Sequence, residues 1–197
     1  MWRTIKQMPK YVLVSGKRGC GKDTIGEGIQ QQLKDRSTIM GFSYMNKYKF
    51  CQNENLDYDR LLHDYDYKCQ YRDKLNVFTN DRFKRDGDLT FVNDLMEYAQ
   101  DKPEDQVIVV PDFRFVHEAE FFEKRKKDGD QVVMVRVSTD EDIRKERGWT
   151  YDSKVDESKY ETGLDKYSNF DVVVYNNGTK EDLQKKVIGD ILEKFNL

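Results

Sequence analysis

The sequence lacks several features that would place it in a membrane or in an oxidising compartment. No apolar stretch approaches the roughly 20 residues that a membrane-spanning helix needs, and no apolar signal-peptide core follows the N-terminus. Its three cysteines, Cys20, Cys51 and Cys69, show neither a C-x-x-C motif nor metal-type spacing. Reduced thiols in a cytosol-like compartment therefore fit best. We expect a cytoplasmic protein without a membrane span.

Strong net charge and a catalytic histidine are also missing. With 34 basic and 37 acidic residues the net charge is only −3, which argues against a nucleic-acid partner bound by bulk positive charge. His63 and His117 stand alone, and we expect surface or capping roles for both. No Ser/His/Asp order and no His/Cys cluster appears. Any binding or catalytic function must therefore depend on other residues than the histidines and cysteines.

One short stretch does carry a chemical signal. The apolar run Tyr11–Ser15 is of strand type, and it leads into Gly16-Lys-Arg-Gly-Cys-Gly-Lys-Asp-Thr24. This segment fits the phosphate-binding loop G-x-x-x-x-G-K-[ST], with Asp23 at the position of the usual Ser or Thr. Glycines let backbone N–H groups converge on phosphate oxygens, and a helix N-terminus adds partial positive charge. The alternative, a basic turn that binds nothing, is disfavoured by the strand before it and the helix after it.

The remaining pattern predicts an α/β fold, a mostly parallel sheet flanked by helices, in a single domain over residues 1–197. Apolar runs of strand type and helical spacings alternate along the chain. We expect strands at 37–42, 107–110, 131–137 and 171–175, and helices starting at residue 23 or 24 and over 56–62, 67–83, 89–99, 116–127, 140–147 and 180–195. Residues 149–169 read as an irregular, charged stretch, so we expect a lid over about 140–169.

Two carboxylates are candidates for holding Mg²⁺. Asp23 can bind the ion directly or through water; alternatively it caps the helix and Thr24 is the ligand. Asp112 follows the buried run Val107–Val110, at the carboxyl end of a strand, where open α/β sheets place ligands. The alternative role for Asp112 is also to cap the helix that follows. We favour the metal role for both.

Several arginines lie far from the loop in sequence. Arg114 follows Asp112 at the same strand end. Arg144 and Arg147 are spaced i, i+3 on a short charged helix, and could reach phosphates or form surface ion pairs. A second basic group in the middle of the chain could bind an anionic acceptor or be a solvated face. It contains Arg72, Lys74, Arg82, Lys84 and Arg85.

These residues together resemble a known family. The sequence is similar to animal-type phosphomevalonate kinases, which are P-loop kinases of the nucleoside-monophosphate-kinase-like group. The resemblance covers nearly the whole chain. It rests on Ser15-Gly-Lys-Arg-Gly-Cys-Gly-Lys-Asp23, Leu56-Asp-Tyr-Asp-Arg-Leu-Leu62, Tyr67-Lys68, Tyr71-Arg-Asp-Lys74, Val110-Pro-Asp-Phe-Arg114, Glu146-Arg-Gly-Trp149, Glu161-Thr-Gly-Leu-Asp165 and Asn169-Phe-Asp-Val-Val173. Phe115 departs from the pattern, since the family usually has a second arginine there.

The resemblance implies ATP- and Mg²⁺-dependent phosphorylation of a small phosphorylated acceptor, 5-phosphomevalonate, by a protein that we take as a monomer. It implies catalytic roles for Lys17, Arg18, Lys22, Arg114 and Arg147. ATP would be bound by Gly16, Lys17, Arg18, Gly19, Gly21, Lys22, Asp23, Thr24 and Arg144, and the acceptor by Arg72, Arg85 and Arg114. Two alternatives stay open: a phage-type deoxynucleoside-monophosphate kinase, and a P-loop switch or adaptor that binds nucleotide to control a partner.

Overall fold

The computed structural model describes residues 8–184 and 188–194. The chain forms two compact units. The sheet unit comprises the chain up to Met40 and from Asp101 onward, and the helical unit comprises Gly41–Gln100. None of the helices in these described ranges is both long and apolar enough to cross a membrane.

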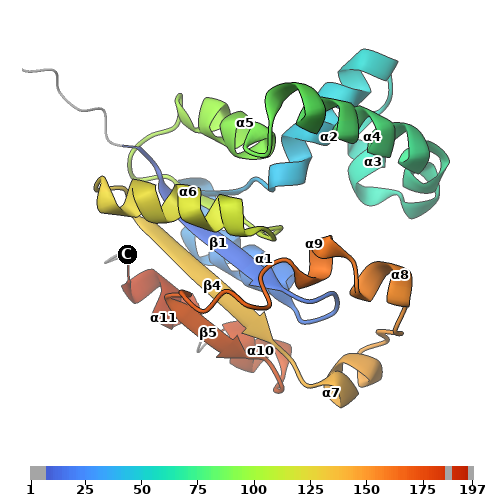
Figure 1. The fold of residues 1–197 in the computed structure, drawn as a ribbon. Helices are drawn as coiled ribbons and strands as arrows, with labels where there is room; N and C mark the ends of the chain where they lie inside the picture. The colour runs from blue at the N-terminus through green and yellow to red at the C-terminus, as the bar shows by residue number, and fades with distance from the viewer. Residues whose placement is uncertain (1–7, 185–187, 195–197) are drawn as a thin grey trace, which may run out of the picture. The chain divides into compact units, whose positions relative to one another are not determined.

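The sheet unit alternates strands and helices (Figure 1). Its elements are β1 (Lys10–Gly16), α1 (Lys22–Leu33), the 3₁₀ helix η1 (Lys34–Arg36), β2 (Ser37–Ile39), β3 (Val107–Val110), α6 (Val116–Lys127), β4 (Val132–Ser138), α7 (Glu141–Glu146), α8 (Ser153–Asp156), α9 (Lys159–Thr162), β5 (Val172–Tyr175), α10 (Lys180–Asp182) and α11 (Ile188–Glu193).

The five strands form one sheet in the order β2-β3-β1-β4-β5, and every pairing is parallel. The central strands are near-continuous apolar runs because helices cover both faces of the sheet. Val12 and Val14 pack on one face with Ile25 and Ile29 of α1. On the other face, the ring of Tyr11 lies 5.3 Å from that of Phe122 in α6. The prediction of a mostly parallel, helix-flanked sheet is confirmed.

The carboxyl ends of these strands meet at one edge of the sheet, and this edge positions the site. The β1–β3 register pairs Leu13 with Val110, and the Phe113 N–H donates to the Val14 carbonyl oxygen at 3.4 Å. The two strands therefore stay side by side beyond their regular pairing, which brings Asp112 next to the start of the glycine-rich loop.

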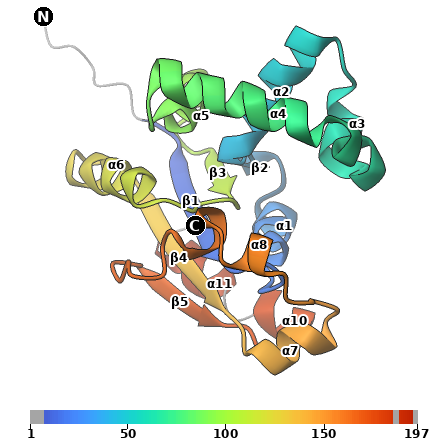
Figure 2. The same cartoon turned by 45° about the vertical axis from the view of Figure 1, so that its right-hand side comes forward.

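The helical unit consists of α2 (Phe42–Glu54), α3 (Tyr58–His63), α4 (Tyr65–Asp86) and α5 (Thr90–Ala99) (Figure 2). The Asp57 side chain caps α3 and the Asp64 side chain caps α4. Phe50 and Leu61 form the centre of its small core, and the rings of Phe50 and Phe78 lie 5.5 Å apart.

The structure differs from the sequence-based expectation in two ways: the 149–169 stretch contains the short helices α8 and α9, and a helix begins where the end of a strand was expected. The strand expected at 37–42 ends at Ile39, and Phe42 begins α2, a helix that the sequence did not predict. The buried residues Phe42, Asn46 and Phe50 of α2 follow helical spacing, but the polar asparagine interrupts the apolar pattern. The described part of the helix expected over 180–195 consists of α10 and α11. Residues 185–187 and 195 lie outside the described residues, and they include Val187, which the helical spacing predicts to face inward.

A buried carboxylate, Glu118, lies in the first turn of α6. Glu118 accepts hydrogen bonds from the backbone N–H groups of Arg114 and Phe115, at 2.8 and 2.9 Å, through one oxygen. Burial raises the pKa of Glu118 to about 8. The two backbone donors oppose this rise, the Asp112 carboxylate adds to it, and the Arg114 guanidinium again opposes it.

We predict that Glu118 makes the protein less stable as the pH rises. Between its ordinary pKa near 4.5 and about 8, the folded state binds more protons than the unfolded state, so the free energy of unfolding falls with pH. The slope is about 1.4 kcal/mol per pH unit at most. Chemical denaturation of the wild type and of Glu118→Gln from pH 5 to pH 9 measures it. The two should match at pH 5 and the variant should be the more stable at pH 9; parallel curves would contradict the prediction.

Candidate active site

The glycine-rich loop links β1 to α1 and is closely packed against the turn that follows β5. Gly21 has a φ of 91°, a conformation that favours glycine. A Cβ atom at Gly21 would collide with the side-chain amide of Asn176. That amide donates to the Cys20 carbonyl oxygen at 2.9 Å and is buried. The loop therefore depends on a bare backbone at Gly21 and on the Asn176 amide behind it.

The end of the loop is the N-terminus of α1. Lys22, Asp23 and Thr24 form the first turn of this helix, where unpaired backbone N–H groups and the helix dipole favour an anion. Within the described ranges, the Lys22 ammonium and the Asp23 carboxylate make neither a hydrogen bond nor an ion pair. Both are therefore available to a ligand. The Cys20 thiol, by contrast, is buried, and burial raises its pKa, so it is not a nucleophile.

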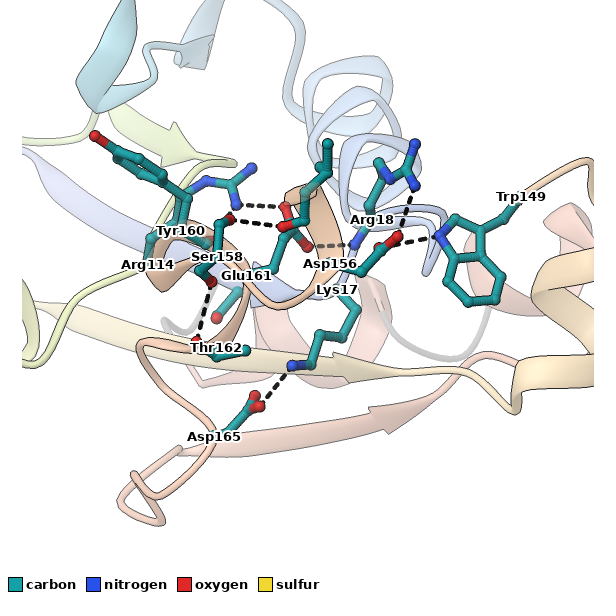
Figure 3. A network of polar contacts seen from close by, with 12 residues as sticks. Lys17, Arg18, Arg114, Trp149, Asp156, Ser158, Tyr160, Glu161, Thr162 and Asp165 are labelled. Carbon is teal, nitrogen blue, oxygen red and sulfur yellow. Dashed lines mark hydrogen bonds and ion pairs between the residues drawn. The ribbon is translucent and has the colours of Figure 1, made fainter. Parts of the chain in front are cut away.

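Carboxylates of the 149–169 stretch hold the cations of the loop (Figure 3). The Arg18 Nη2 donates to Asp156 at 2.7 Å and to the Thr150 carbonyl oxygen at 2.8 Å. Burial acts to raise the pKa of Asp156, but hydrogen bonds from Arg18, from the Asp152 N–H and from Trp149 lower it to about 2. Asp156 therefore stays ionised opposite Arg18.

The second loop cation is compensated in the same way. The Lys17 ammonium donates to Asp165 at 2.5 Å, and the Arg136 guanidinium donates to the other oxygen of Asp165 at 2.9 Å. Arg136 comes from β4, where its register partner is Ser15, and it also donates to the Ser15 hydroxyl at 3.0 Å. Asp165 thus links the loop to β4.

Glu161 in α9 connects the loop to the end of β3. Its Oε1 accepts from Arg114 at 2.7 Å and its Oε2 accepts from the backbone N–H of Arg18 at 2.7 Å. Arg114 also donates to the Tyr160 carbonyl oxygen. The structure therefore brings Lys17, Arg18 and Arg114 together through three acidic side chains of one segment.

Arg144 and Arg147 separate in space although they lie on one short helical segment. The Arg144 Nε donates to the Arg18 carbonyl oxygen at 3.0 Å, and its guanidinium stacks 3.8 Å from the centre of the Trp149 ring. Arg147 instead donates to the carbonyl oxygens of Asn176 and Gly178, at 2.9 and 2.7 Å. Arg144 contacts the loop, while Arg147 holds the turn after β5.

A pocket of about 320 Å³ lies between the loop and this turn. Arg147 stands at its wall, beside backbone of the loop and the start of α10. The lining residues are Gly19, Gly21, Thr24, Arg147, Asn176, Gly178, Thr179, Lys180 and Leu183. The pocket opens next to the phosphate-binding backbone, so one ligand can occupy both.

The residues present fit a phosphate ligand with its metal. Within residues 8–184 and 188–194, the buried Arg18 Nε has no hydrogen-bond partner, so the protein leaves this donor unused. Among the described residues, no group of three or more His, Cys, Asp or Glu side chains could hold a metal ion unaided. Mg²⁺ in kinases is bound by one or two carboxylates together with substrate phosphates, so the two carboxylates predicted from the sequence, Asp23 and Asp112, would be enough in number.

Two of the three arginines expected to bind the acceptor, Arg72 and Arg85, belong to the helical unit. Arg72 is exposed, lies 6.0 Å from the centre of the Tyr65 ring and donates weakly to the Cys69 sulfur. Arg85 is paired with its neighbour Asp86 at 2.7 Å. Their role in the acceptor site stays a prediction.

Several site residues were not assigned a function from the sequence. Glu161 and Asp165 stood in a motif that carried the family resemblance, without a role. Arg136 was detectable as a charge inside the apolar run Val132–Val137, a costly position that calls for a partner. Asn176 belongs to the sequence Asn176-Asn-Gly178, which is typical of a turn, and no sequence signal links it to the loop that it supports.

We predict that Lys22→Met abolishes phosphoryl transfer and leaves the fold intact. Removing a single preorganised cation or donor from charge that develops in a transition state lowers kcat by about 100-fold or more. Because the ammonium has no partner in the described protein, the free energy of unfolding should change by about 0.5 kcal/mol or less. Steady-state turnover and denaturation measure the two effects. Lys124→Met, at an exposed position of α6, is the control; unchanged turnover in Lys22→Met would exclude the donor role.

We also predict that Gly21→Ala weakens nucleotide binding. The new methyl group would meet the Asn176 amide and force the loop out of its conformation. Titration calorimetry with a non-hydrolysable ATP analogue should show a loss of affinity of about tenfold or more. Gly189→Ala is the matched control, since open space surrounds that position in α11. Equal affinity in both variants would mean that the loop does not bind the nucleotide.

Comparison with solved structures places the fold among kinases. An adenosine-5′-phosphosulfate (APS) kinase, CysC, from Mycobacterium tuberculosis, solved with AMPPNP and APS, aligns with a TM-score of 0.54 at 13% identity, covering 95% of this chain and 99% of that chain. A gluconokinase from Sinorhizobium meliloti 1021 aligns with a TM-score of 0.55 at 14% identity, covering 96% and 97%. These likenesses concern the fold.

Sequence comparison is more specific. The family model described as phosphomevalonate kinase matches residues 14–128. The phosphomevalonate kinase of Drosophila melanogaster is 33% identical over 191 residues, which cover 96% of this chain and 98% of that protein. A match over more than half of the chain, and a relative aligned along nearly all of it, lead to the same conclusion as the loop and arginine motifs: the chain belongs to the phosphomevalonate kinase family.

Proposed function

We propose that this chain transfers the γ-phosphoryl group of ATP to 5-phosphomevalonate, giving 5-diphosphomevalonate and ADP. The observation that carries the proposal is the group of cations at the loop, together with membership of the family. Lys17, Arg18 and Arg114 converge on one short segment of acidic side chains. Such a site can bind two phosphorylated molecules that would otherwise repel each other.

The donor half combines the loop with the pocket beside it. The nucleoside of ATP would lie in the pocket lined by Arg147 and Leu183, and its phosphates on the backbone N–H groups of the loop. Lys22 would contact the β- and γ-phosphates. Mg²⁺, bound through Asp23 and Asp112, would neutralise charge on the phosphate oxygens. The protein's own contribution is to hold the phosphates in line and to exclude water.

The acceptor needs little activation. Its attacking group is a phosphate oxygen that is already anionic, so the reaction requires charge shielding and alignment rather than a strong general base. Both histidines fit this view: His63 is exposed and bonded to Asp59, and the His117 ring stacks on Phe115. Arg114 would contact the acceptor phosphate, with Arg72 and Arg85 proposed as further contacts.

The charged stretch 149–169, which carries Asp156, Glu161 and Asp165 and is called the acidic segment below, would act as a lid. In the ligand-free protein its carboxylates compensate the charge of Lys17 and Arg18. When phosphates bind they would replace part of this compensation, and the segment would settle over the substrates. The lid over 140–169, the monomeric state and the cytoplasmic location all stay proposals.

We predict that 5-phosphomevalonate is the preferred acceptor. A coupled assay of ADP release should give a kcat/KM for it at least about 100-fold above that for any deoxynucleoside monophosphate, because discrimination of this size follows from a few polar contacts. The wild-type chain is assayed with MgATP and a panel of both acceptor classes, and Lys22→Met gives the background. Preference for a deoxynucleoside monophosphate would indicate the phage-type activity instead. Nucleotide binding without turnover on any acceptor would favour a switch.

A further inference from the structure

The motif Glu161-Thr-Gly-Leu-Asp165 contains two carboxylates that bind to the glycine-rich loop, and they differ in solvent exposure (Figure 3). The Asp165 side chain is 38% exposed and pairs with the ammonium of Lys17, itself 30% exposed. The Glu161 side chain is 6% exposed. An exposed pair exchanges readily with solvent or ligand, whereas a buried carboxylate without its partners is costly.

Glu161 uses its two oxygens on two different parts of the site. One oxygen accepts a hydrogen bond from the backbone N–H of Arg18 and none from the Arg18 side chain. This hydrogen bond fixes the path of the loop and leaves the Arg18 guanidinium to other partners. The other oxygen accepts from the Arg114 guanidinium at the end of β3. A single carboxylate thereby sets the distance between the phosphate-binding loop and the arginine proposed to contact the acceptor.

The helix that carries Glu161 is anchored independently of this carboxylate. Gly163, at the end of α9, lies so close to the segment that follows β3 that a Cβ atom there would be 2.5 Å from the Arg114 carbonyl oxygen. The Tyr160 carbonyl oxygen accepts from Arg114, and the Tyr160 ring meets the Phe115 ring edge-on, with 5.5 Å between centroids. Phe115 occupies the position where the family usually has a second arginine. A part of the lid held by this many contacts is a fixed support for the site.

We infer that Glu161 is a positioning residue for phosphoryl transfer, which holds the Arg18 backbone and the Arg114 guanidinium at the spacing that the reaction requires. The inference rests on the proposed function in that it takes Arg114 to contact the acceptor. Glu161 itself need not touch either substrate. Asp165 has a different role: it is a counter-ion that phosphates displace from Lys17.

The test is a double-mutant cycle in the full-length chain. Glu161→Gln keeps the volume of the side chain, but when its amide oxygen accepts from Arg18, its amide nitrogen faces the guanidinium of Arg114, donor against donor. We expect kcat to fall at least tenfold while the KM for ATP changes less than threefold, because the nucleotide pocket is untouched. Arg114→Ala should also lower kcat. If Glu161 acts through Arg114, adding Glu161→Gln to Arg114→Ala should cost less than twofold more.

Glu157→Gln is the matched control. This residue lies in the same segment, is exposed, and is hydrogen-bonded to the Tyr151 hydroxyl, away from the loop. It should leave kcat, KM and thermal stability unchanged.

A second measurement needs no acceptor. Glu161→Ala removes both hydrogen bonds, so amide hydrogen exchange of the loop peptide that contains Arg18 should become at least tenfold faster in the ligand-free protein. In Glu157→Gln the exchange should match the wild type. Unchanged exchange in Glu161→Ala would overturn the inference.

Two kinetic outcomes would also overturn it. Effects of Glu161→Gln and Arg114→Ala that multiply would mean that Glu161 does not act through Arg114, and an unchanged kcat in Glu161→Gln would mean that it positions nothing. The cycle uses whichever acceptor the wild-type chain turns over best. If that acceptor is not 5-phosphomevalonate, the proposed function fails while Glu161 is still tested. If no acceptor works, the exchange measurement decides alone.

Discussion

Mutual repulsion between cations is the constraint on which the site depends. Lys17, Arg18, Arg114, Arg136 and Arg144 gather at one edge of the sheet, and like charges this close destabilise the fold unless opposite charges offset them. The chain supplies the counter-charges from a single segment, as Asp156, Glu161 and Asp165. The acidic side chains of this segment therefore make a strongly basic site compatible with a stable fold, and they tie residues 156–165 to the glycine-rich loop.

The sheet makes this gathering possible. Parallel strands all end at the same edge, so the loop after β1, the Pro-Asp-Phe-Arg segment after β3 and the turn after β5 become neighbours, although they are far apart in sequence. The apolar runs that form the strands thus determine where the polar chemistry lies. The Cys20 carbonyl, the Asn176 amide and the Arg147 guanidinium then connect the loop, the turn and the short helical segment in one chain of hydrogen bonds.

How much of this the sequence could predict depends on the range of the interaction. Glycine spacing, helix starts and apolar strands are local sequence patterns, so the loop, the sheet and several helices were predictable. Helix α6 was predicted with the correct first and last residues. Helix α2 was not, because its buried face includes Asn46, which bonds to Thr79 in α4, a partner that no local pattern reveals. The partners of the loop cations were missed for the same reason. Many aspartates and glutamates surround Glu161 in sequence, and only the fold distinguishes the buried one.

The close packing of Gly21 against Asn176 limits which substitutions these two positions can accept during evolution. The two positions share one small volume, so neither can change freely without the other. A larger residue in the loop would require a smaller one in the turn after β5, and loss of the amide would leave the Cys20 carbonyl without its donor. The residues at positions 21 and 176 should therefore vary together among relatives of this chain.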